Sequence, residues 1–88
     1  MKNKIVIITG SARGIGFAIA KKFAEQEAKV IILDLMQDAV DMAVKNLNSE
    51  GFQAFGYAAN VTDAEKIADT FKDIMKEHGS IDVLINNA

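Results

Sequence analysis

The residues with the clearest chemical potential lie in a glycine-rich turn near the N-terminus, Gly10-Ser11-Ala12-Arg13-Gly14-Ile15-Gly16. Glycine tolerates the sharp bends of such a turn, and without a Cβ it lets backbone N–H groups approach a phosphate closely. A helix that begins directly after the turn adds free N–H donors and the positive end of its dipole. These residues therefore predict a site for the phosphates of a nucleotide.

The spacing within the turn argues against two other phosphate chemistries. A Walker-type loop closes with Gly-Lys-Ser/Thr, whereas Gly14 is followed by Ile15 and Gly16, so ATP or GTP hydrolysis is unsupported. A phosphoacceptor receiver domain needs acidic residues at the ends of its early strands, and the first predicted strand ends in Thr9.

A second signal is Asp34, which ends the second predicted strand about 20 residues after the turn. A carboxylate at this place can accept hydrogen bonds from both ribose hydroxyls of an adenosine. The glycine turn and Asp34 together predict a binding site for a dinucleotide, with S-adenosylmethionine as the alternative ligand. A methyltransferase-like site usually has an acid at the end of the first strand, and Thr9 argues against it.

The apolar pattern around these residues alternates between strand and helix periods. The first two strands are apolar on both faces, which is typical of parallel strands covered by helices. The predicted strands are 5–9, 30–34, 53–59 and 81–85, and the predicted helices are 14–27, 37–50 and 62–78. The order β-α-β-α-β-α-β predicts an α/β fold, the N-terminal part of a Rossmann-type doubly wound parallel sheet.

Each predicted helix has an apolar face, and its ends carry recognisable residues. Gly51 and Gly79 suit the left-handed position that often follows a helix. Thr62, with Glu65 three residues later, has the pattern of a capping box and predicts the start of the third helix. The residues expected to face the sheet are Ile15, Ala18, Ile19 and Phe23 in the first helix, Val40, Ala43, Val44 and Leu47 in the second, and Ile67, Phe71, Ile74 and Met75 in the third.

The last predicted strand bears on domain organisation. Val83, Leu84 and Ile85 are apolar on both faces, so we expect this strand to be central in a finished sheet. Natural domains avoid an exposed apolar edge. We therefore expect residues 1–88 to be the N-terminal dinucleotide-binding part of a single domain that continues beyond residue 88.

Composition excludes several classes of protein. Half of the 88 residues are apolar and a quarter are charged, as in a globular chain. Ten Lys and Arg are scattered among twelve acids, so no nucleic-acid partner is predicted. The lack of cysteine excludes a zinc-thiolate site, and no metal site is predicted. No apolar run is long enough to span a membrane. The chain has no cysteine, and we expect it in the cytoplasm.

Three motifs together resemble those of a known family. The glycine turn has three residues between its first two glycines and one between the last two, and the third and fourth strands end in Asn60-Val61-Thr62-Asp63 and Asn86-Asn87-Ala88. In these motifs, and over all 88 positions, the chain resembles the short-chain dehydrogenases/reductases. Within that family it is most similar to bacterial 3-oxoacyl-acyl-carrier-protein reductases.

The resemblance implies a set of cofactor-binding residues. These are Gly10, Ser11, Ala12, Arg13, Gly14, Ile15, Gly16, Asp34, Asn60, Val61, Asn87 and Ala88. The glycine turn would surround the pyrophosphate and the adenine ribose, which Asp34 would also hold. Asn60, more often aspartate in the family, would face the adenine amino group as a neutral and weaker acceptor, with Val61 packed on the ring.

At the other end of the cofactor, Asn87 would line the nicotinamide-side ribose, and Asn86 would stabilise the strand end. No catalytic residue is expected within 1–88, because the family's catalytic Ser, Tyr and Lys lie farther along the chain. Tyr57, the one tyrosine, has Val61 where a Tyr-x-x-x-Lys motif needs lysine. The sequence also departs from the family's pattern at Glu27, where relatives usually have a glycine that ends the first helix.

The resemblance implies an NAD(P)-dependent oxidoreductase, a homotetramer that reduces an acyl-carrier-protein-linked 3-oxoacyl thioester in fatty acid synthesis, or another small carbonyl substrate, by hydride transfer. The alternative is a nucleotide-binding module without catalysis, either a short protein or an engineered half-domain. Asp34 favours NAD(H), because a 2′-phosphate would place negative charge beside its carboxylate. Arg13 keeps NADP(H) possible, and the relatives most resembled mostly use NADPH.

Overall fold

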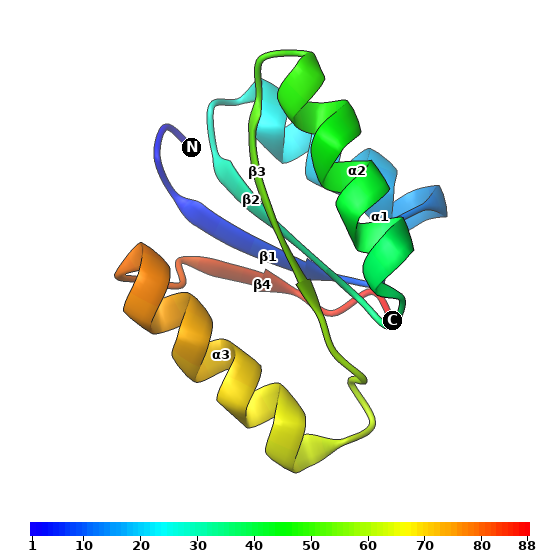
Figure 1. Cartoon of the computed structure of the whole chain (residues 1–88). Coiled ribbons are helices and arrows are strands. Elements are labelled where there is room, and N and C mark those ends of the chain that lie inside the picture. Colours follow the sequence, from blue (N-terminus) through cyan, green and yellow to red (C-terminus); the bar gives the residue numbers. More distant parts are fainter.

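The computed structural model describes residues 1–88 as one parallel sheet with helices on both faces. The elements are β1 (Ile5–Thr9), α1 (Gly14–Glu25), β2 (Lys29–Asp34), α2 (Gln37–Ser49), β3 (Gln53–Ala58), α3 (Ala64–His78) and β4 (Val83–Ile85). The strand order is β3-β2-β1-β4, and every pair is parallel. α1 and α2 cover one face of the sheet and α3 lies on the other (Figure 1). The predicted Rossmann-type α/β fold is confirmed.

The sheet divides the core into two apolar clusters, because the side chains of β1 and β2 alternate between its faces. The larger cluster contains Val6 and Ile8 of β1 and packs with α1 and α2. The smaller contains Ile5 and Ile7 and packs with Ile74 of α3. Both strands are buried on both faces, as their sequences predict.

α1 turns only part of the expected face to the sheet, because Ile19 and Phe23 pack against the core whereas Ala18 is exposed. Its buried residues are Gly16, Ala20 and Ala24, each four positions from the last. Ile15, which we expected to pack inward, is 75% exposed. Small side chains allow the helix backbone to approach the strands closely, and this close contact overrides the spacing of the larger apolar residues.

α2 presents the face that its periodicity predicts, with Val40, Ala43 and Leu47 buried. The contact with β3 depends on Gly56. A Cβ placed on Gly56 would lie 2.5 Å from Cγ1 of Val40, so no larger residue fits while α2 keeps its position.

α3 begins one residue later than the capping-box pattern predicts. Asp63 is the N-cap, and its carboxylate accepts a hydrogen bond from the backbone N–H of Lys66. Thr62 does not cap the helix, because its hydroxyl accepts no hydrogen bond from the first turn and instead donates, like its backbone N–H, to Oδ1 of Asn60. Gly79 ends the helix in the left-handed conformation, as expected. None of the helices is long and apolar enough to cross a membrane.

β4 lies at the sheet edge beside β1, and Leu84 is 49% exposed there. Asp82 fixes the start of this strand, because its Oδ2 accepts from the N–H of Ile5 at 2.8 Å while its own N–H donates to the Ile5 carbonyl oxygen at 2.9 Å. The Ile5 hydrogen bond holds the pKa of the Asp82 carboxyl below its usual value.

All three helices are followed by a residue with positive φ. Gly51 after α2 has a φ of 88° and Gly79 after α3 a φ of 86°, but the residue after α1 is Glu27, with a φ of 68°. The N–H groups of Glu27 and Ala28 donate to carbonyl oxygens of the last helical turn, which is the usual role of a glycine at this position.

Glu27→Gly is expected to stabilise the protein by about 1 kcal/mol, because glycine adopts positive φ without the steric cost of a Cβ. Chemical denaturation of both forms measures this difference. Glu25→Gly, within α1, is the matched control and is expected to lose about 1 kcal/mol. A clearly destabilised Glu27→Gly form would contradict the role assigned to the left-handed conformation.

Candidate functional site

The glycine turn crosses the carboxyl edge of the sheet, between the end of β1 and the start of α1. Gly10 and Gly14 have φ values of 63° and 64°, which glycine adopts without strain. Gly16 lies against the start of the turn, and a Cβ on it would be 2.2 Å from the carbonyl oxygen of Gly10. The turn therefore needs each of its three glycines, two for backbone conformation and one for close packing.

Four backbone N–H groups at the start of α1, those of Arg13 to Gly16, have no acceptor within the protein. The first hydrogen bond of the helix runs from the N–H of Phe17 to the carbonyl oxygen of Arg13, at 3.4 Å. No acidic residue occupies the first turn, and nothing lies within 4 Å of the Cβ position on Gly14. This open row of donors at a helix N-terminus fits a phosphate group.

Ser11 has a positioning role within the turn. Its side chain is completely buried, and its hydroxyl donates to the Ile8 carbonyl oxygen at 2.6 Å and accepts from the Leu33 N–H at 3.1 Å. Because these bonds use both functions of the hydroxyl, the Ser11 side chain does not face a ligand. It joins β1 to β2 beneath the turn.

Asp34, at the end of β2, is attached to the same turn. Its Oδ2 accepts from the Ala12 N–H at 3.0 Å and its Oδ1 accepts from the Leu35 N–H at 2.8 Å. A carboxylate has about four acceptor positions, so these two bonds leave capacity on both oxygens. The structure thus brings Asp34 next to the glycine turn, as the sequence predicts.

The chain segment after β4 reaches the turn from the other side. Thr9 Oγ1, buried at the end of β1, accepts from the N–H groups of Asn87 and Ala88 at 3.0 and 3.1 Å. It lies 3.2 Å from Oδ1 of Asn86, to which its hydroxyl donates. The side-chain amide of Asn87 donates to the Gly10 carbonyl oxygen at 3.3 Å. In the sequence, Thr9 stands out only as the polar residue that ends a buried strand just before a glycine. That position is the one signal of its role in holding residues 86–88.

Asn60 and Val61 follow β3, which lies on the side of β2 away from β1 and the glycine turn. The N–H of Ala59 donates to the Asp34 carbonyl oxygen at 2.9 Å, which places the next two residues beside the end of β2. The side chain of Val61 is 39% exposed. Oδ1 of Asn60 accepts both the N–H and the hydroxyl of Thr62, at 2.9 and 2.6 Å.

Tyr57 and His78 lie between β3 and α3, on the face of the sheet that α3 covers. The Tyr57 hydroxyl donates to Glu77 and lies 3.2 Å from Nε2 of His78, whose ring meets that of Phe55 edge to face. Burial, followed by the hydrogen bond to Glu77, raises the pKa of the Tyr57 phenol above its usual value. The Tyr57 hydroxyl thus connects β3 to the end of α3.

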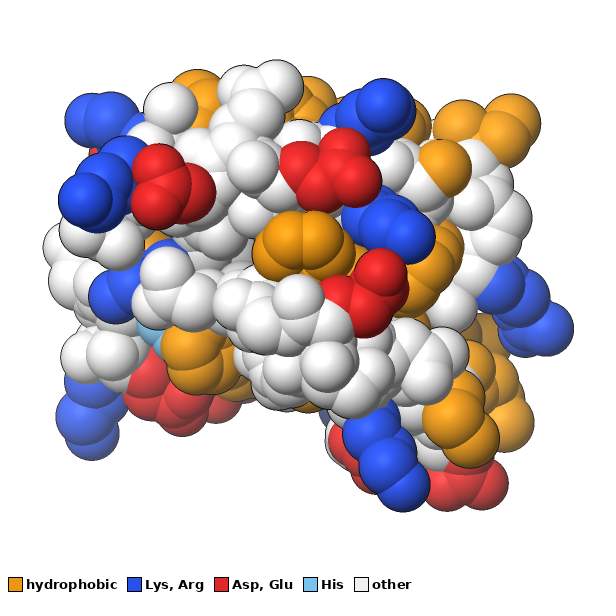
Figure 2. All heavy atoms as spheres, turned by 90° about the horizontal axis from the view of Figure 1, so that it is seen from above, with side chains coloured by type: hydrophobic (Ala, Val, Ile, Leu, Met, Phe, Trp, Pro, Cys, Tyr) orange, Lys and Arg blue, Asp and Glu red, His pale blue; other side chains and the backbone are white.

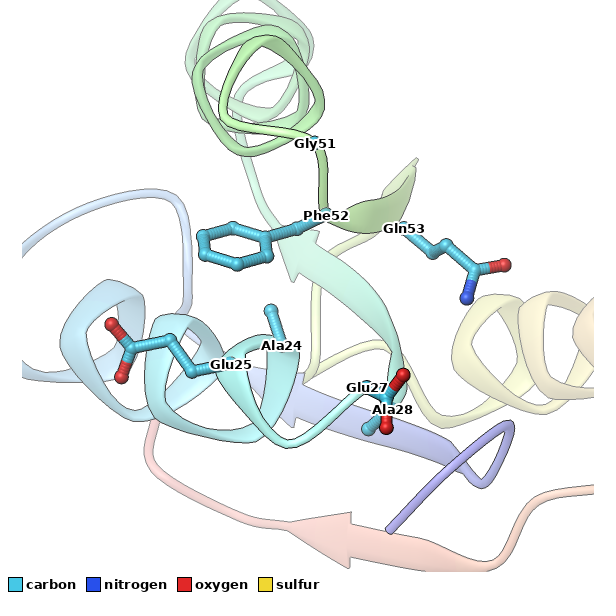
Figure 3. A pocket seen from close by; sticks show the side chains of 7 residues that line it. All are labelled: Ala24, Glu25, Glu27, Ala28, Gly51, Phe52 and Gln53. Atoms are coloured by element: carbon cyan, nitrogen blue, oxygen red, sulfur yellow. The ribbon is translucent and has the colours of Figure 1, made fainter.

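A hollow of about 270 Å³ occupies the amino edge of the sheet, opposite the glycine turn. The side chain of Phe52 lies over the end of α1, with Glu25 and Glu27 on either side of it (Figure 3). Charge is mixed on the face shown in Figure 2, where basic and acidic side chains alternate. The His, Asp and Glu side chains form no group of three that could hold a metal ion.

The family model of short chain dehydrogenases matches residues 4–88. The chain belongs to this family. The oxidoreductase YxjF of Bacillus subtilis, itself uncharacterized, is 42% identical over 100% of this chain and 34% of its own length. The 5-keto-D-gluconate 5-reductase of Escherichia coli K12 is 41% identical over 100% of this chain and 35% of its own length. The chain thus spans about a third of the length of these relatives.

Solved structures of short-chain dehydrogenases share the fold. A metagenomic short-chain oxidoreductase in complex with NADP has a TM-score of 0.95 and 28% identity, over 100% of this chain and 40% of its own. An NAD⁺-bound xylitol dehydrogenase has a TM-score of 0.93 and 31% identity, over 99% of this chain and 33% of its own. The structural neighbours of this chain therefore include one in complex with NADP and one bound to NAD⁺.

Thr9→Val should disrupt the junction between the turn and residues 86–88, because it keeps the side-chain shape but removes the shared hydroxyl. We expect a loss of about 1–3 kcal/mol of stability, measured by chemical denaturation, and faster hydrogen exchange at the amides of Asn87 and Ala88. Thr9→Ser, which keeps the hydroxyl, is the control and should protect both amides. Unchanged exchange in the valine form would show that Thr9 does not hold this segment.

Proposed function

We propose that residues 1–88 form the cofactor site of an NAD(P)-dependent oxidoreductase and belong to one Rossmann-type domain that continues beyond residue 88. The observation that carries this proposal is the row of four free N–H donors beside an anchored carboxylate, at the carboxyl edge of a parallel sheet. A pyrophosphate binds to such N–H donors, and the hydroxyls of an adenosine ribose donate to such a carboxylate. The membership of the chain in the short-chain dehydrogenase family supports the same assignment.

In this proposal each group of residues along the carboxyl edge binds a different part of the cofactor. The pyrophosphate would lie against the glycine turn, and Asp34 would accept from both hydroxyls of the adenosine ribose with its remaining capacity. Asn60 and Val61 would contact the adenine. Asn87 and Ala88, held by Thr9, would border the nicotinamide-side ribose.

The bound nicotinamide supplies hydride transfer, and the protein places and polarises the groups around it. The proton donor, the Ser and Lys beside it, and the subunit contacts of a homotetramer would lie outside residues 1–88. We propose a 3-oxoacyl thioester, free or carried by acyl-carrier protein, as substrate, on the resemblance of the strand-end motifs to 3-oxoacyl-acyl-carrier-protein reductases. The second candidate is a polyhydroxylated ketone, favoured by similarity to 5-keto-D-gluconate 5-reductase.

The complete protein is expected to prefer NAD(H) to NADP(H). A 2′-phosphate about 4 Å from the Asp34 carboxylate would be repelled by roughly 4 kcal/mol at an effective dielectric of 20, before screening. Arg13, which is exposed and has no ion-pair partner, could recover about 1–3 kcal/mol. The hydrogen bonds from Ala12 and Leu35 oppose movement of the carboxylate away from the ribose.

Cofactor titrations and kcat/KM for both dinucleotides measure this preference on the full-length protein. Asp34→Ala should reduce the difference in kcat/KM between NADH and NADPH. Asp38→Ala, which removes an acid from the first turn of α2, should leave this difference unchanged. A preference of the unmodified protein for NADPH by about tenfold or more would mean that Arg13 outweighs Asp34.

Residues 1–88 alone are expected to turn over no ketone, because they contain no suitable proton donor and no substrate-binding half. The absorbance of the reduced nicotinamide, followed in the presence of an acetoacetyl thioester, tests this expectation. The full-length protein is the positive control. Turnover above background by an authenticated 88-residue chain would contradict it, and absence of turnover by the full-length protein would favour a nucleotide-binding module.

A further inference from the structure

The order of the strands determines where the base of a dinucleotide would lie. Along the carboxyl edge the glycine turn leaves β1, Asp34 ends β2, and Asn60 follows β3. If phosphates bind at the turn and the ribose at Asp34, as proposed above, the next group of the nucleotide extends toward Asn60. The hydrogen bond from Ala59 to Asp34 joins these two positions.

The hydrogen bonds of Asn60 fix the orientation of its side-chain amide. The backbone N–H of Thr62 can only donate, so the atom 2.9 Å from it must be the oxygen Oδ1 of Asn60. The hydroxyl of Thr62 donates to the same oxygen at 2.6 Å. Two donors occupy the two lone pairs of this carbonyl oxygen, and the Nδ2 group of Asn60 has no partner in the protein.

We propose that Asn60 makes the base subsite a hydrogen-bond donor, so that the protein accepts a purine with an oxygen at C6 at least as well as adenine. The 6-amino group of adenine is itself a donor and finds no free acceptor on Asn60. The 6-oxo group of hypoxanthine accepts from the Nδ2 group. An aspartate here would behave differently, because one oxygen could accept from Thr62 while the other accepted from an amino group.

This inference rests on the proposed function and is tested by binding. Dissociation constants of NADH and of reduced nicotinamide hypoxanthine dinucleotide are measured on the full-length protein by calorimetry. The unmodified protein should bind the hypoxanthine compound as tightly as NADH or more tightly. Asn60→Asp should shift the ratio of the two constants toward NADH by about tenfold, the factor for one hydrogen bond of about 1.4 kcal/mol.

Two further variants separate the role of the oxygen from that of charge. Thr62→Val removes the hydroxyl that occupies one lone pair of Asn60, and it should shift the ratio toward NADH by about threefold. Asn46→Asp adds the same charge on α2, away from the edge, and should leave the ratio unchanged.

The outcomes distinguish this inference from the function on which it depends. If both dinucleotides bind and Asn60→Asp leaves their ratio within about twofold of the unmodified value, Asn60 does not select the base and the inference is overturned. A preference of the unmodified protein for NADH of more than about tenfold overturns it as well. If neither dinucleotide binds, the proposed function itself fails.

Discussion

The buried hydroxyl group of Ser11, together with backbone hydrogen bonds from Gly10 and Ser11 to the Leu33 carbonyl oxygen, joins the two central strands at the point where the candidate site begins. Beyond Thr9 and Leu33 the regular pairing of β1 with β2 ends, because the chain turns away through Gly10. The Ser11 side chain continues the connection by bonding to Ile8 on one strand and Leu33 on the other. Without it, buried backbone groups of both strands would lose a partner at a cost of about 1–3 kcal/mol.

This link sets the distance between the two parts of the site. Ser11 holds the base of the turn on β2, and the next residue, Ala12, donates to the carboxylate that ends the same strand. The free N–H donors of the turn and Asp34 are therefore fixed relative to each other by bonds that need no ligand. A site of this kind is organised before binding, which lowers the entropic cost of ordering it around a cofactor.

Much of this arrangement follows from the sequence, because it depends on periodicity. The order of strands and helices matches the prediction, and the glycine turn and Asp34 lie at the ends of the first two strands as expected. The inward face of α1 was predicted only in part: Ile19 and Phe23 pack against the core, but the contact at Gly16 depends on how closely a helix can approach a strand, which apolar spacing does not report. The third helix begins one residue later than predicted, because Asp63 and not Thr62 accepts the capping hydrogen bond. The roles of Ser11 and Thr9 depend on atoms brought together by the fold, and no local pattern marks them.

The hydroxyl of Thr9 also connects the site to the order in which the chain folds. β1 can pair with β2 after closing a loop of moderate length, but Thr9 meets Asn87 only after the chain has come back across a separation of 78 residues. Contacts of such long range form late, because the loop entropy must be lost before they can stabilise anything. The end of the edge formed by the glycine turn and Asp34 can therefore organise early, whereas the end formed by residues 86–88 stays incomplete until β4 has docked.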